Sequence, residues 1–178
     1  MNANRISITS TLLIALSLST AQAGDKKMGA GEARETLKDI QQSAAMAEDQ
    51  AGELLAISGK TTVSPDSHLM RLMALKDELN KAGQEITRLE SESPAPWERQ
   101  AIGKALPLLA DAASNTQKAI EYFRENKARL WTPEYQGYAE RISRDSTEAA
   151  RTLRDYLSYA QARDREVRLE QRLGMSGE

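Results

Sequence analysis

The sequence contains no cysteine, a single histidine and a single phenylalanine, and aromatic residues make up only 4% of its 178 residues. The lack of cysteine excludes disulfides, thiolate metal sites, cysteine nucleophiles, covalently attached c-type haem and a lipoprotein anchor. The one histidine, His68, is the only side chain suited to acid–base or axial-ligand chemistry near neutral pH. We therefore expect a non-catalytic protein with no metal site and no resident cofactor.

An excess of charge of one sign is also missing. The chain has 24 Lys and Arg against 26 Asp and Glu, a formal net charge of −2, while 40% of its residues are apolar. Nucleic-acid and anionic-membrane binders carry a marked basic excess. The balance here predicts no nucleic-acid partner, and the apolar fraction is sufficient for a packed core.

Long hydrophobic runs are absent except at the N-terminus. Residues 1–5 carry one positive charge, residues 6–18 are uncharged and mostly apolar, and residues 19–23 end in the small-x-small pattern of a signal-peptidase site. The run is shorter than the roughly 20 residues that span a bilayer. We expect cleavage after Ala23, export to a bacterial periplasm and no membrane span in the mature protein. Loss of Arg5 moves the net charge from −2 to −3.

Apolar and small residues recur at alternating spacings of three and four through the remaining chain, which is typical of one face of a helix. The pattern predicts helices over residues 32–58, 64–89, 97–130 and 132–173, separated by proline and glycine signals. The predicted core positions of the first two are Ala33, Leu37, Ile40, Ala44, Ala47, Ala51, Leu54, Leu72, Leu75, Leu79, Ala82, Ile86 and Leu89. Those of the last two are Ala101, Ala105, Leu108 or Leu109, Ala112, Ala119 or Ile120, Phe123, Tyr135, Tyr138, Ile142, Ala149, Leu153, Tyr156, Ala160 and Val167.

Short connections between long helices favour an all-α, antiparallel up-down four-helix bundle with coiled-coil-like helices. We expect one domain over residues 32–174, preceded by a flexible leader (24–31) and followed by a disordered tail (175–178). A long three-helix arrangement or an open, dimerising coiled coil is the alternative. The fourth helix would be about 60 Å long against about 40 Å for the first two, so its last turns are expected to project. Pro107 predicts a kink in the third helix and leaves open whether that kink is a hinge.

Charge is the most individual feature of the fourth predicted helix, which carries eight arginines, eight acids and no lysine. Four expected i,i+4 pairs are Arg141/Asp145, Arg144/Glu148, Arg151/Asp155 and Asp164/Arg168. One interpretation is a solvated face held by such pairs. The other is an interaction surface for an acidic partner or a second copy, formed by Arg163, Arg165, Arg168 and Arg172 with Tyr156 and Tyr159. The first helix carries Glu48, Asp49 and Glu53, which would complement these arginines in a dimer or remain solvated.

His68 lies in register with the core positions of the second helix. As a haem ligand it would need an opposing group such as Met46, Met70 or Met73; the simpler interpretation is a half-exposed histidine at the rim of the core. Trp97 and Trp131 are expected to cover the bundle ends. The sequence thus favours an exported bundle acting by helix–helix interaction with itself or with another envelope protein. The alternative is a bundle that binds haem or another small ligand, with His68 and the tyrosines as contacts.

Overall fold

The computed structural model describes residues 30–91 and 94–174. They form helices α1 (Ala30–Ser58), α2 (Pro65–Ser91), α3 (Pro96–Glu125) and α4 (Pro133–Leu173), and no strand occurs in these two ranges. The predicted all-α fold is confirmed. The predicted signal peptide (1–23), residues 24–29 of the leader and the tail (175–178) lie outside the described residues. Helix α1 begins at Ala30, two residues before the predicted start.

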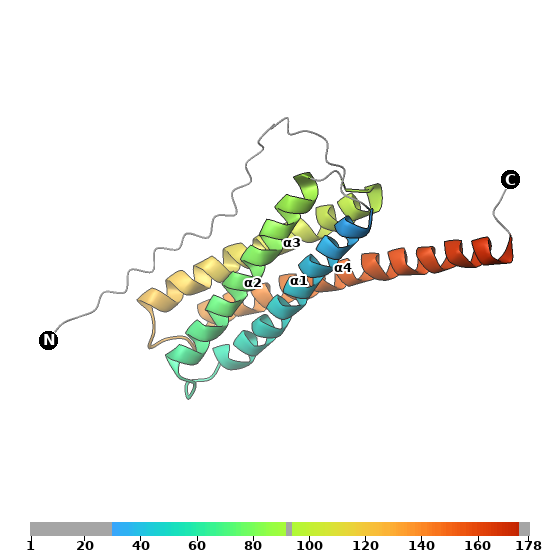
Figure 1. Cartoon of the computed structure of the whole chain (residues 1–178). Coiled ribbons are helices and arrows are strands. Elements are labelled where there is room, and N and C mark those ends of the chain that lie inside the picture. Colours follow the sequence, from blue (N-terminus) through green and yellow to red (C-terminus); the bar gives the residue numbers. More distant parts are fainter. Residues whose placement is uncertain (1–29, 92–93, 175–178) are drawn as a thin grey trace.

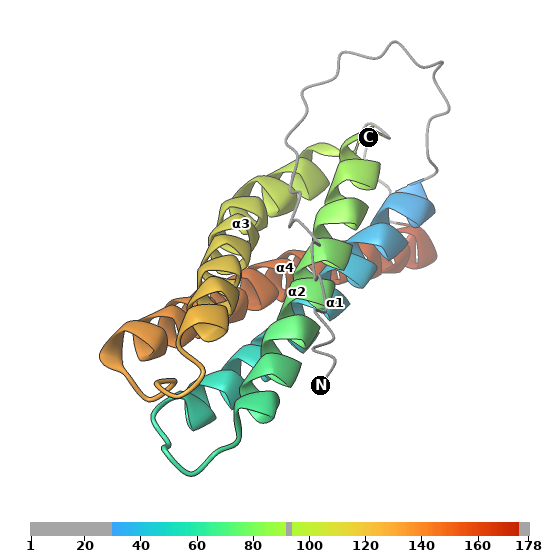
Figure 2. The same ribbon diagram turned by 90° about the vertical axis from the view of Figure 1, so that its left-hand side faces the viewer.

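The helices form an up-down bundle in which each helix lies beside its neighbours in the chain (Figures 1 and 2). Helix α1 packs on α2 and α4, and α3 packs on the same two, so that α1 and α3 face each other across a diagonal. Arg34 near the start of α1 bonds to Asp164 late in α4, whereas Gly59 just after α1 lies beside Gln136 at the start of α4. These contacts show that α1 and α4 are antiparallel, as the predicted topology requires.

The core follows the predicted periodicity closely. All thirteen predicted core positions of α1 and α2 are buried, and in α3 the alternative Leu109 is buried while Leu108 packs at the edge. Alanines at several of these positions, such as Ala44, Ala82 and Ala149, are fully buried. Alanine loses no side-chain entropy on folding and allows close helix–helix approach. The bundle interior is therefore narrow.

Two helix boundaries follow directly from local chemistry. The Ser67 backbone N–H donates to the Ser64 hydroxyl (3.4 Å), which makes Ser64 the N-terminal cap of α2. Gly174 ends α4 with φ of 67°, and its N–H donates to carbonyl groups of the last turn. An L-residue with a side chain adopts this left-handed conformation at a cost, and glycine adopts it freely.

Helix α3 ends at Glu125, five residues before the predicted end. The N–H of Asn126 donates to the Tyr122 carbonyl (2.8 Å), and its side-chain amide donates to the same oxygen (3.3 Å). An asparagine whose side chain bonds to its own helix end can stop a helix without glycine or proline. The predicted end, which relied on such signals, was therefore placed too late. Helix α3 continues through Pro107, which lies inside the predicted helix, and the kink expected there stays a prediction.

Helix α4 has 41 residues, whereas the other three have 27 to 30. Its last buried residue is Ala160, and all that follow up to residue 174 are exposed except the half-buried Asp164. Figure 1 shows this end of α4 extending well past the other helices. The projection predicted from helix length is confirmed, and the projecting end (residues 161–173) is about 20 Å long.

Candidate interaction surface

The projecting end exposes large apolar side chains that a solitary helix does not need. Val167, Leu169 and Leu173 are 43%, 52% and 68% exposed, and Tyr159, just before the projecting end, is 59% exposed. Isolated surface leucines are common, but a gathering of apolar side chains on one exposed segment indicates an interaction site. The segment is therefore a candidate interaction surface, at the place where the sequence proposed one.

These side chains fall on two sides of the helix. Val167 was predicted as a core position because it continues the inward-facing row of Leu153 and Ala160; that prediction is wrong, because Val167 lies past the last buried residue of α4 and is exposed. The other side carries a row at spacings of three, four, three and four, all of it exposed, which we call the outer stripe: Tyr159, Ala162, Glu166, Leu169 and Leu173. With 3.6 residues per turn, this spacing places the five residues on one face.

The four predicted arginines do not share one face. Arg165 and Arg172 lie along one flank of the outer stripe, with Arg168 further round, whereas Arg163 lies on the opposite flank with Glu170. Within the part of the chain that the structure describes, no carboxylate lies within ion-pair distance of any of these four arginines.

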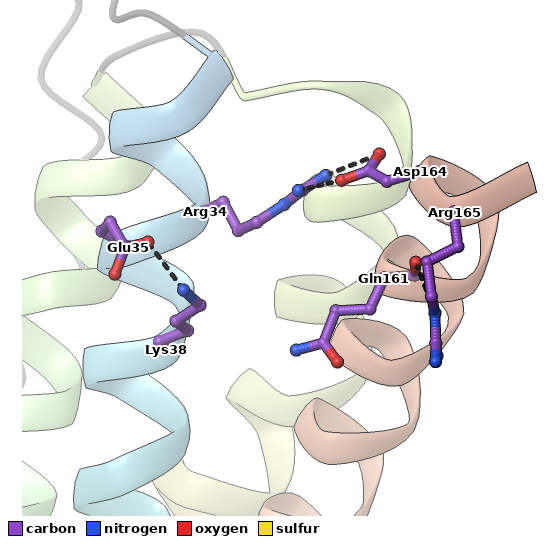
Figure 3. A network of polar contacts seen from close by, with 6 residues as sticks. All are labelled: Arg34, Glu35, Lys38, Gln161, Asp164 and Arg165. Atoms are coloured by element: carbon purple, nitrogen blue, oxygen red, sulfur yellow. Dashed lines mark hydrogen bonds and ion pairs between the residues drawn. The ribbon is translucent and has the colours of Figure 1, made fainter. Parts of the chain in front are cut away.

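The projecting end is anchored where it leaves the bundle by Arg34 of α1. Both terminal nitrogens of Arg34 donate to the carboxylate of Asp164, one at 3.3 Å, and the guanidinium lies over the ring of Trp97, 5.9 Å from its centroid. Figure 3 shows the side chains of Arg34 and Asp164 meeting between α1 and α4. The hydrogen bond from Arg34 lowers the pKa of Asp164, and the nearby charges of Arg168 and Arg163 lower it further.

Around this anchor the surface is hollowed by a space of about 200 Å³. Its lining includes Trp97, Tyr159, Arg163 and Val167 beside the Arg34–Asp164 pair. Trp97 is half-buried at this end of the bundle, as expected, whereas Trp131 at the other end is 48% exposed and does not cover it. The hollow joins the bundle end to the start of the outer stripe.

The expected i,i+4 ion pairs of α4 are not the ones that form. Arg144 instead pairs with its neighbour Asp145 (2.9 Å), and Arg151 pairs with Glu148 one turn earlier (2.5 Å). Arg141 donates to the Asn115 side chain (3.0 Å), and Asp164 bonds to Arg34 rather than to Arg168. Arg141 and Asp164 bond to neighbouring helices, whereas Arg144 and Arg151 pair with nearer acids of α4 itself. The preference for pairing four residues apart is worth only about 0.2–0.5 kcal/mol and does not decide between such partners.

Two acids of α1 that were candidates for binding a second copy find partners within the chain. Glu53 pairs with Arg71 of α2 (2.6 Å), and Glu48 lies 3.6 Å from Arg154 of α4. Surface pairs of this kind contribute little to stability, about 0–1 kcal/mol. Glu48 and Glu53 thus have partners within the chain, whereas Asp49, the third predicted acid, is exposed.

The two tyrosines predicted beside the arginines have different surroundings. Tyr156 is half-buried and packs against the core, with the Lys104 ammonium 5.6 Å from its ring centroid. Tyr159 is exposed and belongs to the outer stripe. Tyr159 therefore contributes to the candidate surface, and Tyr156 contributes to packing between α3 and α4.

His68 is buried, not half-exposed as expected. It is 1% exposed, and its Nδ1 lies 3.2 Å from the hydroxyl of Tyr135, which is itself fully buried. Burial lowers the pKa of His68 and raises the pKa of Tyr135, because the low-dielectric interior disfavours both charged forms. The contact crosses the bundle from α2 to α4 and holds a neutral imidazole in place.

The surroundings of His68 do not fit a haem ligand. The Tyr135 ring, whose centroid lies 5.5 Å from that of the imidazole, occupies the adjacent space, and Tyr122 packs on Tyr135 in turn. Of the three proposed opposing ligands, Met46 and Met70 are 44% and 57% exposed, and Met73 is half-buried. A porphyrin beside His68 would have to displace the tyrosines that fill this end of the bundle.

Within residues 30–91 and 94–174, no group of three or more potential metal ligands comes together, and no helix is sufficiently long and apolar to cross a membrane. A shallow hollow of about 570 Å³ beside α4 is lined mainly by charged or small residues, including Glu140 and Arg144.

No known protein family matches this chain, and neither curated proteins nor solved structures include one significantly similar to it.

Proposed function

We propose that this protein is an exported, non-catalytic helical bundle that acts through helix–helix contact at the projecting end of α4. One observation carries the proposal. The helix continues for 13 residues past Ala160, the last residue buried in the bundle, and exposes Leu169 and Leu173 on one face. Burial of one such leucine against a partner contributes about 1.5–3 kcal/mol.

The physical state of the projecting end supports the same proposal. Helices of roughly a dozen residues are marginal in water without tertiary contacts, because few backbone bonds offset the cost of nucleation. Here the bundle supplies the nucleus, and the Arg34–Asp164 contact fixes the helix at its exit point. A partner would therefore meet a preformed helix and would lose little affinity to ordering it.

The proposed compartment rests on the N-terminal sequence pattern alone. A charged start, an uncharged apolar run and a small-x-small end support export and removal of residues 1–23. The partner is then a component of the envelope, either a second copy or another protein. The single histidine supports a non-catalytic role because it is buried against Tyr135, where no substrate would reach it.

In-cell photocrosslinking tests the proposal. A photoreactive residue at position 169 is expected to give crosslinked products of defined mass in the envelope fraction. The matched control is position 70, because Met70 is also an exposed apolar side chain, 57% exposed, but lies on the bundle itself in α2. Equal crosslinking from both positions, or none from position 169, would contradict the proposal.

A further inference from the structure

Resting on the proposed function, we infer that the projecting end pairs with the same segment of a second copy of this chain, side by side, parallel and in register. The outer stripe is the contact face. Its spacing of three, four, three and four is the a/d pattern of a two-stranded coiled coil. In this pairing Leu169 faces Leu169 of the second copy, and Leu173 faces its own equivalent.

The charges on the two flanks of the stripe select this orientation. In parallel pairs, a residue on one flank meets the residue five positions later on the opposite flank of the partner. Arg165 stands five positions before Glu170 and on the other flank. Each parallel pair therefore brings Arg165 against Glu170 of the second copy, and symmetry forms this contact twice.

An antiparallel pair has no such advantage. In an antiparallel pair each flank of one helix meets the same flank of the other helix. This brings Arg165 against Arg172 of the second copy on one side and Arg163 against Glu170 of the second copy on the other. Attraction and repulsion then offset each other, because like charges destabilise by amounts similar to those by which opposite charges stabilise. In the parallel arrangement Arg165 meets Glu170 and Arg163 meets Ser158, so no flank pair within residues 158–173 is repulsive.

Glu166 is the one charged residue within the stripe. In the parallel pair it faces Glu166 of the second copy and packs beside Arg165 of that copy, which partly balances the charge. Polar residues at such positions weaken a coiled coil while fixing its register. We therefore expect weak, concentration-dependent pairing, and Glu166→Leu is expected to tighten the dimer by about tenfold or more, which corresponds to about 1.4 kcal/mol.

The absence of cysteine from the chain makes the register directly measurable. A disulfide forms only where two Cα atoms lie about 4.4–6.8 Å apart. Purified exported Leu169→Cys protein is expected to give a disulfide-linked dimer under mild oxidation. The matched control is Gln161→Cys, which is also exposed but lies away from the outer stripe, and it is expected to remain monomeric.

A mixture of Glu166→Cys and Leu169→Cys proteins distinguishes the orientations. Parallel pairing gives homodimers of each, whereas preferential 166–169 heterodimers would indicate antiparallel pairing and overturn the inference. If Glu166→Leu stays monomeric at all concentrations while position 169 still crosslinks to a different protein in cells, the inference fails and the proposed function stands. If position 169 crosslinks to nothing, both fail.

Discussion

Replacement of Tyr135 with phenylalanine removes one oxygen atom from the bundle interior and leaves Nδ1 of His68 without its partner. His68 is 1% exposed and Tyr135 is 0% exposed, so water cannot take the place of the lost hydroxyl without opening the bundle end. An orphaned buried polar atom costs about 1–3 kcal/mol. For a domain of this size, each kcal/mol lowers the melting temperature by about 2–4 °C.

A double-mutant cycle separates this effect from a simple change in packing. His68→Leu alone leaves the Tyr135 hydroxyl unpaired in the core and is expected to destabilise by a similar amount. The double variant His68→Leu/Tyr135→Phe has neither orphaned group. Its loss in unfolding free energy should therefore fall short of the sum of the single losses by about 0.5–2 kcal/mol.

Urea unfolding followed by circular dichroism at neutral pH provides the free energies. Tyr156→Phe is the matched control, because Tyr156 is only half-buried and packs beside the Lys104 ammonium. It should change stability by less than about 0.5 kcal/mol. Single losses that add without coupling, or a Tyr135→Phe variant as stable as the wild type, would show that His68 and Tyr135 do not depend on each other.

Three further predictions concern the bundle as a whole. Because burial lowers the pKa of folded His68, the unfolded chain takes up a proton first as pH falls below about 6.5. The free energy of unfolding should therefore fall by up to about 1.4 kcal/mol per pH unit in that range. Urea midpoints of the wild type and of His68→Leu, compared across this pH range, measure the contribution of His68. Removal of residues 165–178 should change the unfolding free energy by less than about 0.5 kcal/mol, because no residue from 165 to 174 is buried, and a larger loss would mean that the segment docks on the bundle. Ala112→Leu should destabilise by about 1–3 kcal/mol through overpacking, whereas Ala56→Leu on the exposed face of α1 should be nearly neutral in a thermal melt.

The core and topology were predictable because helical periodicity is a property of the local sequence. Leu37, Ile40 and Leu72 occupy the inward face whatever their exact partners are. The end of α3 was not predictable to the same accuracy, because it depends on how the Asn126 side chain bonds to its own helix. The α4 ion pairs failed for a related reason: flexible arginines choose among partners of nearly equal energy, some on other helices.

The surroundings of the candidate residues depended on contacts between residues distant in sequence. The burial of His68 involves Tyr135, 67 residues away, and the partner of Asp164 is Arg34, 130 residues away. No spacing rule indicates either pair. The outer stripe, in contrast, was visible in the sequence as a second row with three-four spacing. The sequence prediction included only Tyr159 of this row, because Glu166 interrupts its apolar pattern and Val167 continues the inward row.

The position of the Arg34–Asp164 contact explains why the apolar face of α4 changes sides. Up to Ala160 the inward row is buried against the bundle; at Asp164 that row becomes polar and bonds to Arg34, and after Val167 it continues with Gln171. Over the same turns the outer stripe acquires Leu169 and Leu173. A helix that only completed its own bundle would not need leucines on this exposed face. The polar contact at Asp164 therefore separates a segment whose apolar residues pack inward from one whose leucines are exposed to solvent.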